Sequence, residues 1–232
     1  MVVFDEASQV QPVDAFGAIL RGKQVVVVGD TQQLPPINRY DHILADGDES
    51  EENATSDLES ILGLFLAQGA PEKMLRWHYR SQHEALIAVS NRFFYESRLV
   101  LFPSPDNSKT DLGLKYHYLP NTCYERGKSK TNPKEAKAVA EAVMQHARVS
   151  SKLTLGVVAF SMAQMQAIDD QLELLKRADP SCENFFSSNP HEPFFNKNLE
   201  NVQGDERDVI FISIGYGHDE NKIVSMNFGP LN

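Results

Sequence analysis

The stretch "QVVVVGD" (residues 24–30) places four consecutive valines directly before a glycine and an aspartate. A segment that is apolar at every position, rather than at alternate positions, is typical of a strand buried on both faces of a parallel sheet. A shorter apolar run, "VVF" (2–4), precedes it, and "VDAFGAILR" (13–21) between the two has helical character. The order strand, helix, strand predicts an α/β protein whose parallel sheets are flanked by helices.

Helical and strand-like segments continue to alternate along the chain, which extends this prediction to all 232 residues. We expect a change of unit near Lys73, so that residues 1–72 form the end of one domain and residues 73–232 form most of another. The other expected helices are 58–69, 81–95, 133–148 and 163–177, and the other expected strands are 114–119, 153–160 and 207–216.

The composition indicates a globular protein, because 41% of the residues are apolar but no apolar run approaches the roughly 20 residues that span a bilayer. The N-terminal residues lack the pattern of a secretory signal, so we expect a cytoplasmic protein with no membrane partner. The two cysteines, Cys123 and Cys182, form no CxxC pair and indicate neither a disulfide framework nor a zinc site.

The net charge of −10 is unevenly distributed and therefore does not exclude a nucleic-acid partner. Residues 1–72 hold 3 Lys or Arg against 13 Asp or Glu, whereas residues 73–232 hold 19 of each sign. Much of the acidic excess lies in "DGDESEENATSDLE" (46–59), whose low hydrophobicity and like charges predict a solvated insertion.

The segment "GAILRGK" (17–23) matches most of the phosphate-binding pattern GxxxxGK[ST], but Gln24 stands where the pattern requires Ser or Thr. It also follows a predicted helix and precedes a predicted strand, which is the reverse of the order that places phosphate at a helix N-terminus. We interpret it as a helix end and a turn, so a phosphate-binding loop is missing from this sequence.

Two polar stretches at predicted strand ends supply groups that act beside such a loop. The Asp5 carboxylate is suited to hold a hydrated Mg²⁺, while Glu6 can polarise an attacking water. In "VVVVGDTQQLPP" (25–36), Gln33 offers an uncharged amide at the same sheet edge, where it can respond to a γ-phosphate. An Asp-Glu pair alone is often a helix cap, so the prediction depends on the two stretches together.

The stretches "DEASQ" (5–9) and "GDTQQLPP" (29–36) resemble motifs II and III of superfamily 1 helicases, in particular of the nonsense-mediated-decay helicase-like branch. The resemblance implies RecA-like parallel sheets flanked by helices, with part of the first motor domain and most of the second. Four further stretches fit in the same order: "LRWHYRS" (75–81) is similar to motif IV, "LGVVAFSMAQ" (155–164) to the next strand and loop, "LENVQGDERDVIFISIGY" (199–216) to motif V, and "MNFGPLN" (226–232) to the lead-in of motif VI.

The resemblance implies that ATP, together with Mg²⁺, is the cofactor. Arg80 would act as an arginine finger on the γ-phosphate, a role that suits its planar and permanently charged guanidinium group. Tyr79 would stack on the adenine, and Glu206 would accept hydrogen bonds from the ribose hydroxyls. Glu206 could equally belong to a charged turn before a strand.

Single-stranded DNA or RNA is the partner that the resemblance implies. Ser161, Gln164 and Gln203 are the matching positions for contacts to the strand. Ser161 is also well placed to cap the helix that follows it, and each of the three could simply be a helix cap or a loop residue. We expect the only tryptophan, Trp77, to be a packing anchor rather than a platform for a base.

The implied function is an ATP-dependent helicase that couples hydrolysis to translocation along a single strand. The family's phosphate-binding loop and motif VI arginine have no counterpart in this sequence, so we expect a fragment of a longer enzyme and an isolated chain without ATPase activity. A non-catalytic helicase-fold module that binds nucleic acid or protein is the alternative. An unrelated kinase or GTPase is disfavoured by the stretches that resemble motifs IV and V.

Overall fold

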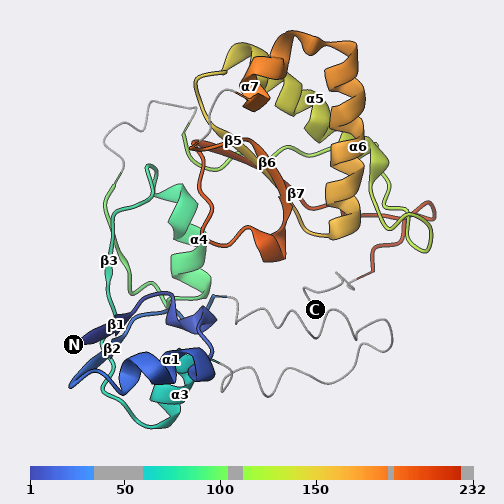
Figure 1. The fold of residues 1–232 in the computed structure, drawn as a ribbon. Helices are drawn as coiled ribbons and strands as arrows, with labels where there is room; N and C mark the ends of the chain where they lie inside the picture. The colour runs from blue at the N-terminus through green and yellow to red at the C-terminus, as the bar shows by residue number, and fades with distance from the viewer. Residues whose placement is uncertain (34–59, 104–111, 188–190, 226–232) are drawn as a thin grey trace. The chain divides into compact units, whose positions relative to one another are not determined.

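The computed structural model describes residues 1–33, 60–103, 112–187 and 191–225 (Figure 1). The chain divides into two compact units, Met1–Tyr116 and His117–Asn232. The acidic insertion 46–59, Pro35 and Pro36, most of the loop 102–111 and the motif VI lead-in 226–232 lie outside the described residues. The domain boundary expected at Lys73 stays a prediction.

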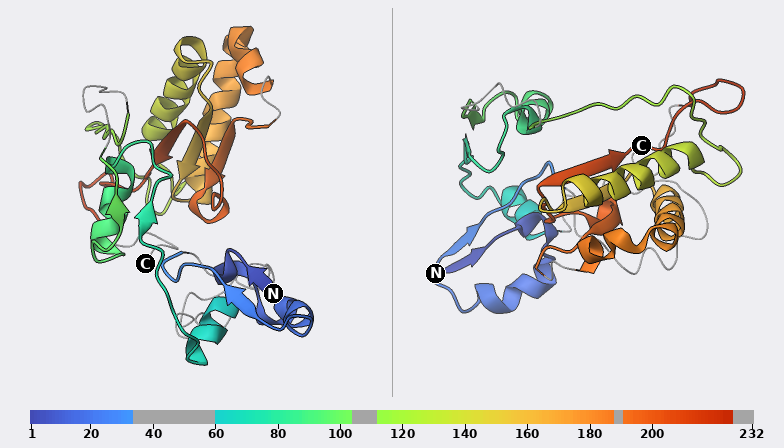
Figure 2. Two further views of the ribbon diagram at one scale, coloured as in Figure 1. Left: turned by 90° about the vertical axis from the view of Figure 1, so that its left-hand side faces the viewer. Right: turned by 90° about the horizontal axis from the view of Figure 1, so that it is seen from above.

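In its described residues, the first unit combines two parallel strand pairs with helices (Figures 1 and 2). β1 pairs with β2, so that Phe4 lies opposite Val27, and β3 pairs with β4. The predicted strands 2–4 and 24–30 are found here, the second of them shorter than expected. The elements are β1 (Val2–Phe4), α1 (Pro12–Ile19), β2 (Val25–Val27), α3 (Ile61–Ala67), β3 (Trp77–His78), α4 (Ala85–Phe93) and β4 (Val100–Leu101).

Local sequence chemistry accounts for the starts of α1 and α3 in the first unit. Pro12 lies in the first turn of α1, where backbone amides have no acceptor within the helix, so the missing N–H of proline costs no helical hydrogen bond. Ser60 caps α3 by accepting a hydrogen bond from the amide of Gly63 at 3.1 Å. α1 ends at Ile19 and β2 starts at Val25, so the segment "GAILRGK" is a helix end and a turn, as predicted.

The second unit is a parallel sheet in the order β6-β5-β7, with α5 and α6 side by side over one face (Figures 1 and 2). The helices and the sheet bury Val143, Leu155 and Ile168 in one core. All residues of the central strand β5 are buried, which explains its continuous apolar sequence. The elements are α5 (Pro133–Val149), β5 (Leu155–Ala159), α6 (Met162–Ala178), α7 (Glu183–Ser187), β6 (Phe195–Asn198) and β7 (Val209–Ser213).

The mixed α/β class with parallel sheets flanked by helices is therefore confirmed. Among the described residues, Ile210 and Ile212 remain exposed on the face of β7 opposite to Val209 and Phe211, which pack against the core, so β7 is less covered than the central strand β5. None of the helices in the described ranges has the length and apolar character needed to cross a bilayer.

One predicted strand is wrong, and three observed strands, β3, β4 and β6, were not predicted. Residues 114–119 form no strand, and Leu114, Tyr116 and Tyr118 are exposed, because an apolar alternation produces a strand only where a partner strand is available. β6 was not predicted because its sequence, "FNKN", is mostly polar. Its pairing with β5 decides its conformation.

Trp77 is also placed differently from the prediction. Its ring centroid lies 5.6 Å from that of Phe102, yet 69% of its surface is exposed. In this chain Trp77 is therefore not a buried packing anchor.

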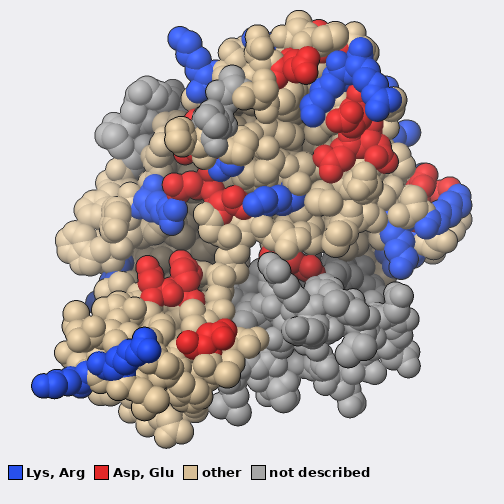
Figure 3. Space-filling view, viewed as in Figure 1, with Lys and Arg blue, Asp and Glu red and all other residues tan. Residues whose placement is uncertain are grey.

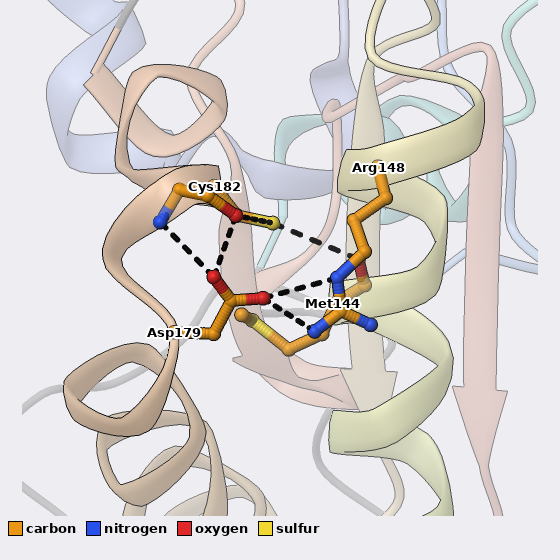
Figure 4. A network of polar contacts seen from close by, with 5 residues as sticks. Met144, Arg148, Asp179 and Cys182 are labelled. Carbon is orange, nitrogen blue, oxygen red and sulfur yellow. Dashed lines mark hydrogen bonds and ion pairs between the residues drawn. The ribbon is translucent and has the colours of Figure 1, made fainter.

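Asp179 joins the end of α5 to the turn that follows α6 (Figure 4). Arg148, in the last turn of α5, donates to Asp179 Oδ2 from Nη2 at 2.6 Å and from Nε at 3.1 Å. Asp179 Oδ1 accepts from the amide of Ser181 at 3.1 Å and from its hydroxyl at 2.5 Å. These hydrogen bonds, from Ser181 first and Arg148 second, lower the pKa of Asp179 from 3.8 to about 2.

The lowered pKa of Asp179 predicts a specific pH dependence of folding. The group contributes stability above its unfolded pKa of 3.8 and loses that contribution as the pH falls towards about 2, because the unfolded chain takes up the proton first. We expect the free energies of unfolding of the wild type and Asp179→Asn to differ above pH 4 and to converge near pH 2, since the contribution is present only while the carboxylate is charged. Denaturant titrations at a series of pH values measure this, and parallel curves for the two proteins would contradict it.

Candidate functional site

The loops that follow β1 and β2 meet at the carboxyl edge of the first sheet. The amide of Ala7, in the loop 5–9, donates to the carbonyl of Val28 at 2.9 Å. A Cβ on Gly29 would lie only 3.1 Å from the backbone nitrogen of Ser8. Glycine at this position therefore permits the close approach of the stretches that resemble motifs II and III.

The two acidic residues of the first loop are exposed and have a constrained backbone. Glu6 has a left-handed conformation (φ 50°, ψ 39°), which is uncommon for a residue with a side chain and is concentrated at functional sites. Asp5 Oδ1 accepts from the amide of Glu6 at 3.0 Å. One exposed carboxylate suits Mg²⁺, which retains several waters and depends on substrate phosphates.

Asp30 gathers the polar groups of the second loop. Its Oδ1 accepts from the amide of Gln32 at 2.9 Å, and its Oδ2 accepts from Gln33 Nε2 at 3.4 Å. The same Oδ2 accepts from the hydroxyl of Tyr95 at 2.5 Å. Burial first, and the hydrogen bond to Asp30 second, raise the pKa of Tyr95 to about 12, so its phenol remains a donor at neutral pH.

Tyr95 is a residue that sequence reasoning missed. It lies 65 positions from Asp30 and just after α4, in a stretch whose aromatic residues read as ordinary apolar positions. No local pattern connects the two residues, so only the folded chain shows that they meet.

Tyr79 and Arg80 lie in a short turn directly after β3. His78 Nε2 and Ser81 Oγ are 2.7 Å apart and close this turn, so that both intervening side chains are exposed. Tyr79 lines a pocket of about 240 Å³ in the first unit. Its other lining residues are His78, Ser81, Glu84, Ile87, Leu101 and Phe102. An aromatic ring at the mouth of a partly apolar pocket is suited to stacking on a planar ligand.

In the second unit, the Ser161 hydroxyl accepts from the amide of Gln164 at 3.2 Å and caps α6. The Gln164 side chain is 1% exposed. Its Oε1 accepts from the amide of Asn132 at 2.8 Å, and its Nε2 donates to Ser213 Oγ at 3.2 Å. Gln164 therefore links α6 to the start of α5 and the end of β7, and this burial argues against a direct contact of its amide with nucleic acid.

Gln203 and Glu206 lie in the loop 199–208, which leads from the end of β6 to the start of β7. The loop turns at Gly204, whose φ of +83° favours glycine. Several side chains fix this loop against the rest of the unit. They are Lys197, which bonds Asp205, Arg207, which donates to the carbonyl of Pro193 at 2.7 Å from Nη2, and Asp208, whose Oδ2 accepts from the Thr154 amide at 2.9 Å.

Charges of both signs are interspersed over α5 and α6 of the second unit (Figure 3). Lys137 and Glu141 form an ion pair along α5, and Lys176 and Arg177 both pair with Glu173 along α6. These exposed pairs contribute little to stability. They agree with the even charge balance of this part of the sequence.

The structure brings some of the predicted site residues together and keeps others in separate units. Asp5, Glu6 and Gln33 lie on loops that follow paired strands of the first unit, which also holds Tyr79 and Arg80. The residues predicted to contact ribose or nucleic acid lie in the second unit; they are Ser161, Gln164, Gln203 and Glu206.

Comparisons with known proteins identify the family to which the chain belongs. Residues 58–227 match the model of a family described as AAA domain. The chain is 30% identical over 241 residues to the uncharacterized ATP-dependent helicase MG140 of Mycoplasma genitalium and 29% identical to its homolog in Mycoplasma pneumoniae. Each alignment covers 99% of this chain, and the chain spans 20% of each relative. The chain therefore belongs to the AAA domain family, and its resemblance to superfamily 1 helicases is confirmed.

Proposed function

We propose that this chain is part of an ATP-dependent helicase that couples ATP hydrolysis to translocation on single-stranded DNA or RNA. The observation that carries the proposal is the backbone contact between the loops 5–9 and 28–33, because it places an acidic pair and an amide at one sheet edge. The helicase names of the two Mycoplasma relatives support the ATP dependence.

In this proposal the residues of the first unit have separate roles in ATP hydrolysis. Asp5 holds Mg²⁺, which would neutralise charge on the phosphates when bound. Glu6 polarises the attacking water, and Gln33 responds to the γ-phosphate. Tyr79 stacks on adenine at the mouth of its pocket, and Arg80 stabilises the charge of the transferring phosphoryl group.

The second unit would contribute the ribose and nucleic-acid contacts. Glu206 accepts hydrogen bonds from the ribose hydroxyls. Ser161, just after β5, and Gln203, in the loop after β6, contact the single-stranded nucleic acid. Gln164 acts indirectly, because its side-chain amide links α6 to the start of α5 and to the end of β7 through hydrogen bonds.

Three further parts of the proposal concern the protein as a whole. Residues 1–72 would be the end of a first motor domain, and residues 73–232 would be most of a second. The isolated chain would be inactive, because no GxxxxGK[ST] loop holds the phosphates. We also propose that the protein acts in the cytoplasm.

The test is ATP hydrolysis by the complete helicase that carries this chain, with and without single-stranded nucleic acid. We expect Glu6→Gln to lower kcat by about 10²- to 10⁴-fold, the usual contribution of a general base, while ATP binding is retained. Glu72→Gln, at another exposed glutamate of the first unit, is the matched control and should leave kcat unchanged. Full activity of Glu6→Gln, or no stimulation by a single strand, would count against the proposed function.

A further inference from the structure

We propose that Tyr95 is a positioning residue for Gln33 and acts through the carboxylate of Asp30, an inference that rests on the proposed function. Asp30 Oδ2 accepts from the Tyr95 hydroxyl at 2.5 Å and from Gln33 Nε2 at 3.4 Å. One oxygen therefore receives both donors. The phenol fixes the carboxylate, and the carboxylate in turn fixes the resting position of the amide that would respond to the γ-phosphate.

The turn that carries Tyr95 is built to hold one conformation. Glu96 and Ser97 follow Tyr95 directly and both have left-handed backbones, with φ of 52° and 57°. Two adjacent non-glycine residues in this region persist only where the surrounding structure enforces them. The conformation is thus imposed on the turn and is not its local preference.

Asn91 provides that enforcement from the end of α4. Its side chain is buried, and it accepts from the amide of Leu99 at 3.0 Å and donates to the carbonyl of Leu99 at 3.3 Å. Its backbone carbonyl accepts from the amide of Ser97 at 2.7 Å. The chain is therefore clamped on the far side of Tyr95, which directs the phenol towards Asp30.

The contact also joins two parts of the candidate nucleotide site. Tyr95 lies at the end of α4, and the turn that precedes α4 carries Tyr79 and Arg80. Asp30 lies on the loop that carries Gln33. The Tyr95–Asp30 hydrogen bond thus connects the proposed γ-phosphate amide to the segment that supplies the proposed arginine finger.

The first experiment is a double-mutant cycle on the ATPase activity of the complete helicase. We expect Tyr95→Phe, which removes only the hydroxyl, to lower kcat roughly tenfold with little change in KM for ATP, as loss of one hydrogen bond to a charged group implies. If Tyr95 acts through Gln33, Tyr95→Phe should cause no further loss in a Gln33→Ala background. Tyr118→Phe, at an exposed tyrosine, is the matched control.

The outcomes separate this inference from the proposed function. Unchanged kcat in Tyr95→Phe, or a full additional loss in the double mutant, would overturn the role of Tyr95 while Glu6-dependent hydrolysis stands. A second measurement needs no ATPase activity: the pKa of Tyr95, followed by NMR of the tyrosine ring, should fall in Asp30→Asn from its wild-type value of about 12. An unchanged pKa would show that the hydrogen bond is not made and would also overturn the inference.

Discussion

Replacement of Arg80 by alanine is expected to lower kcat for ATP hydrolysis of the complete helicase by about 10³-fold or more, the usual contribution of an arginine finger. The side chain is exposed in the turn between His78 and Ser81. Arg80→Lys should recover only part of the activity, because an ammonium group cannot reproduce the two parallel hydrogen bonds of a guanidinium group.

The effect of Arg80 should be specific to hydrolysis and not to folding. Arg92→Ala, which removes an exposed arginine from α4 in the same unit, is the matched control and should retain full activity. Steady-state kinetics with and without a single strand, together with thermal unfolding of each variant, make the comparison. Wild-type kcat in a folded Arg80→Ala protein would exclude the arginine-finger role.

Replacement of Gly156 by alanine is expected to destabilise the second unit by about 1–3 kcal/mol, the cost of overpacking a core. Gly156 lies opposite Phe195 in the β5–β6 pair, and a Cβ there would be 2.3 Å from Phe195 Cζ. Phe195 is only 9% exposed, so packing around the ring limits its movement away from a new Cβ. Gly156→Val should be more destabilising, because it adds two further methyl groups.

Two variants test whether the steric conflict with Phe195 is the cause. Gly17→Ala, in α1, introduces a Cβ with no heavy atom within 4 Å and should stabilise by about 0.5–1 kcal/mol, the usual advantage of alanine over glycine in a helix. Phe195→Leu should recover part of the stability lost in Gly156→Ala. Urea unfolding followed by circular dichroism measures both, and no recovery would show that another contact is responsible.

The sequence determined most of the helices and strands, and the order of the candidate site residues along the chain, because local patterns specify both. The apolar runs at 25–28 and 153–160 predicted β2 and β5, and the segments 133–148 and 163–177 were expected as the helices found as α5 and α6, since each pattern lies within a short stretch of chain. The positions of Asp5, Glu6 and Gln33 after predicted strands were read in the same way. The contact between the loops that carry them followed from the parallel arrangement of those strands.

Only the tertiary structure decided the features that depend on partners far along the chain. The mostly polar β6 is a strand because β5 lies beside it, whereas the apolar segment 114–119 found no partner strand. Gln164 was a candidate for a contact to nucleic acid, but its side chain is buried and is hydrogen-bonded to residues of other elements. The Asp30–Tyr95 bond spans 65 positions. Local sequence patterns carry conformational preference, but hydrogen-bond satisfaction and packing are decided between segments, so they emerge only when the segments are brought together.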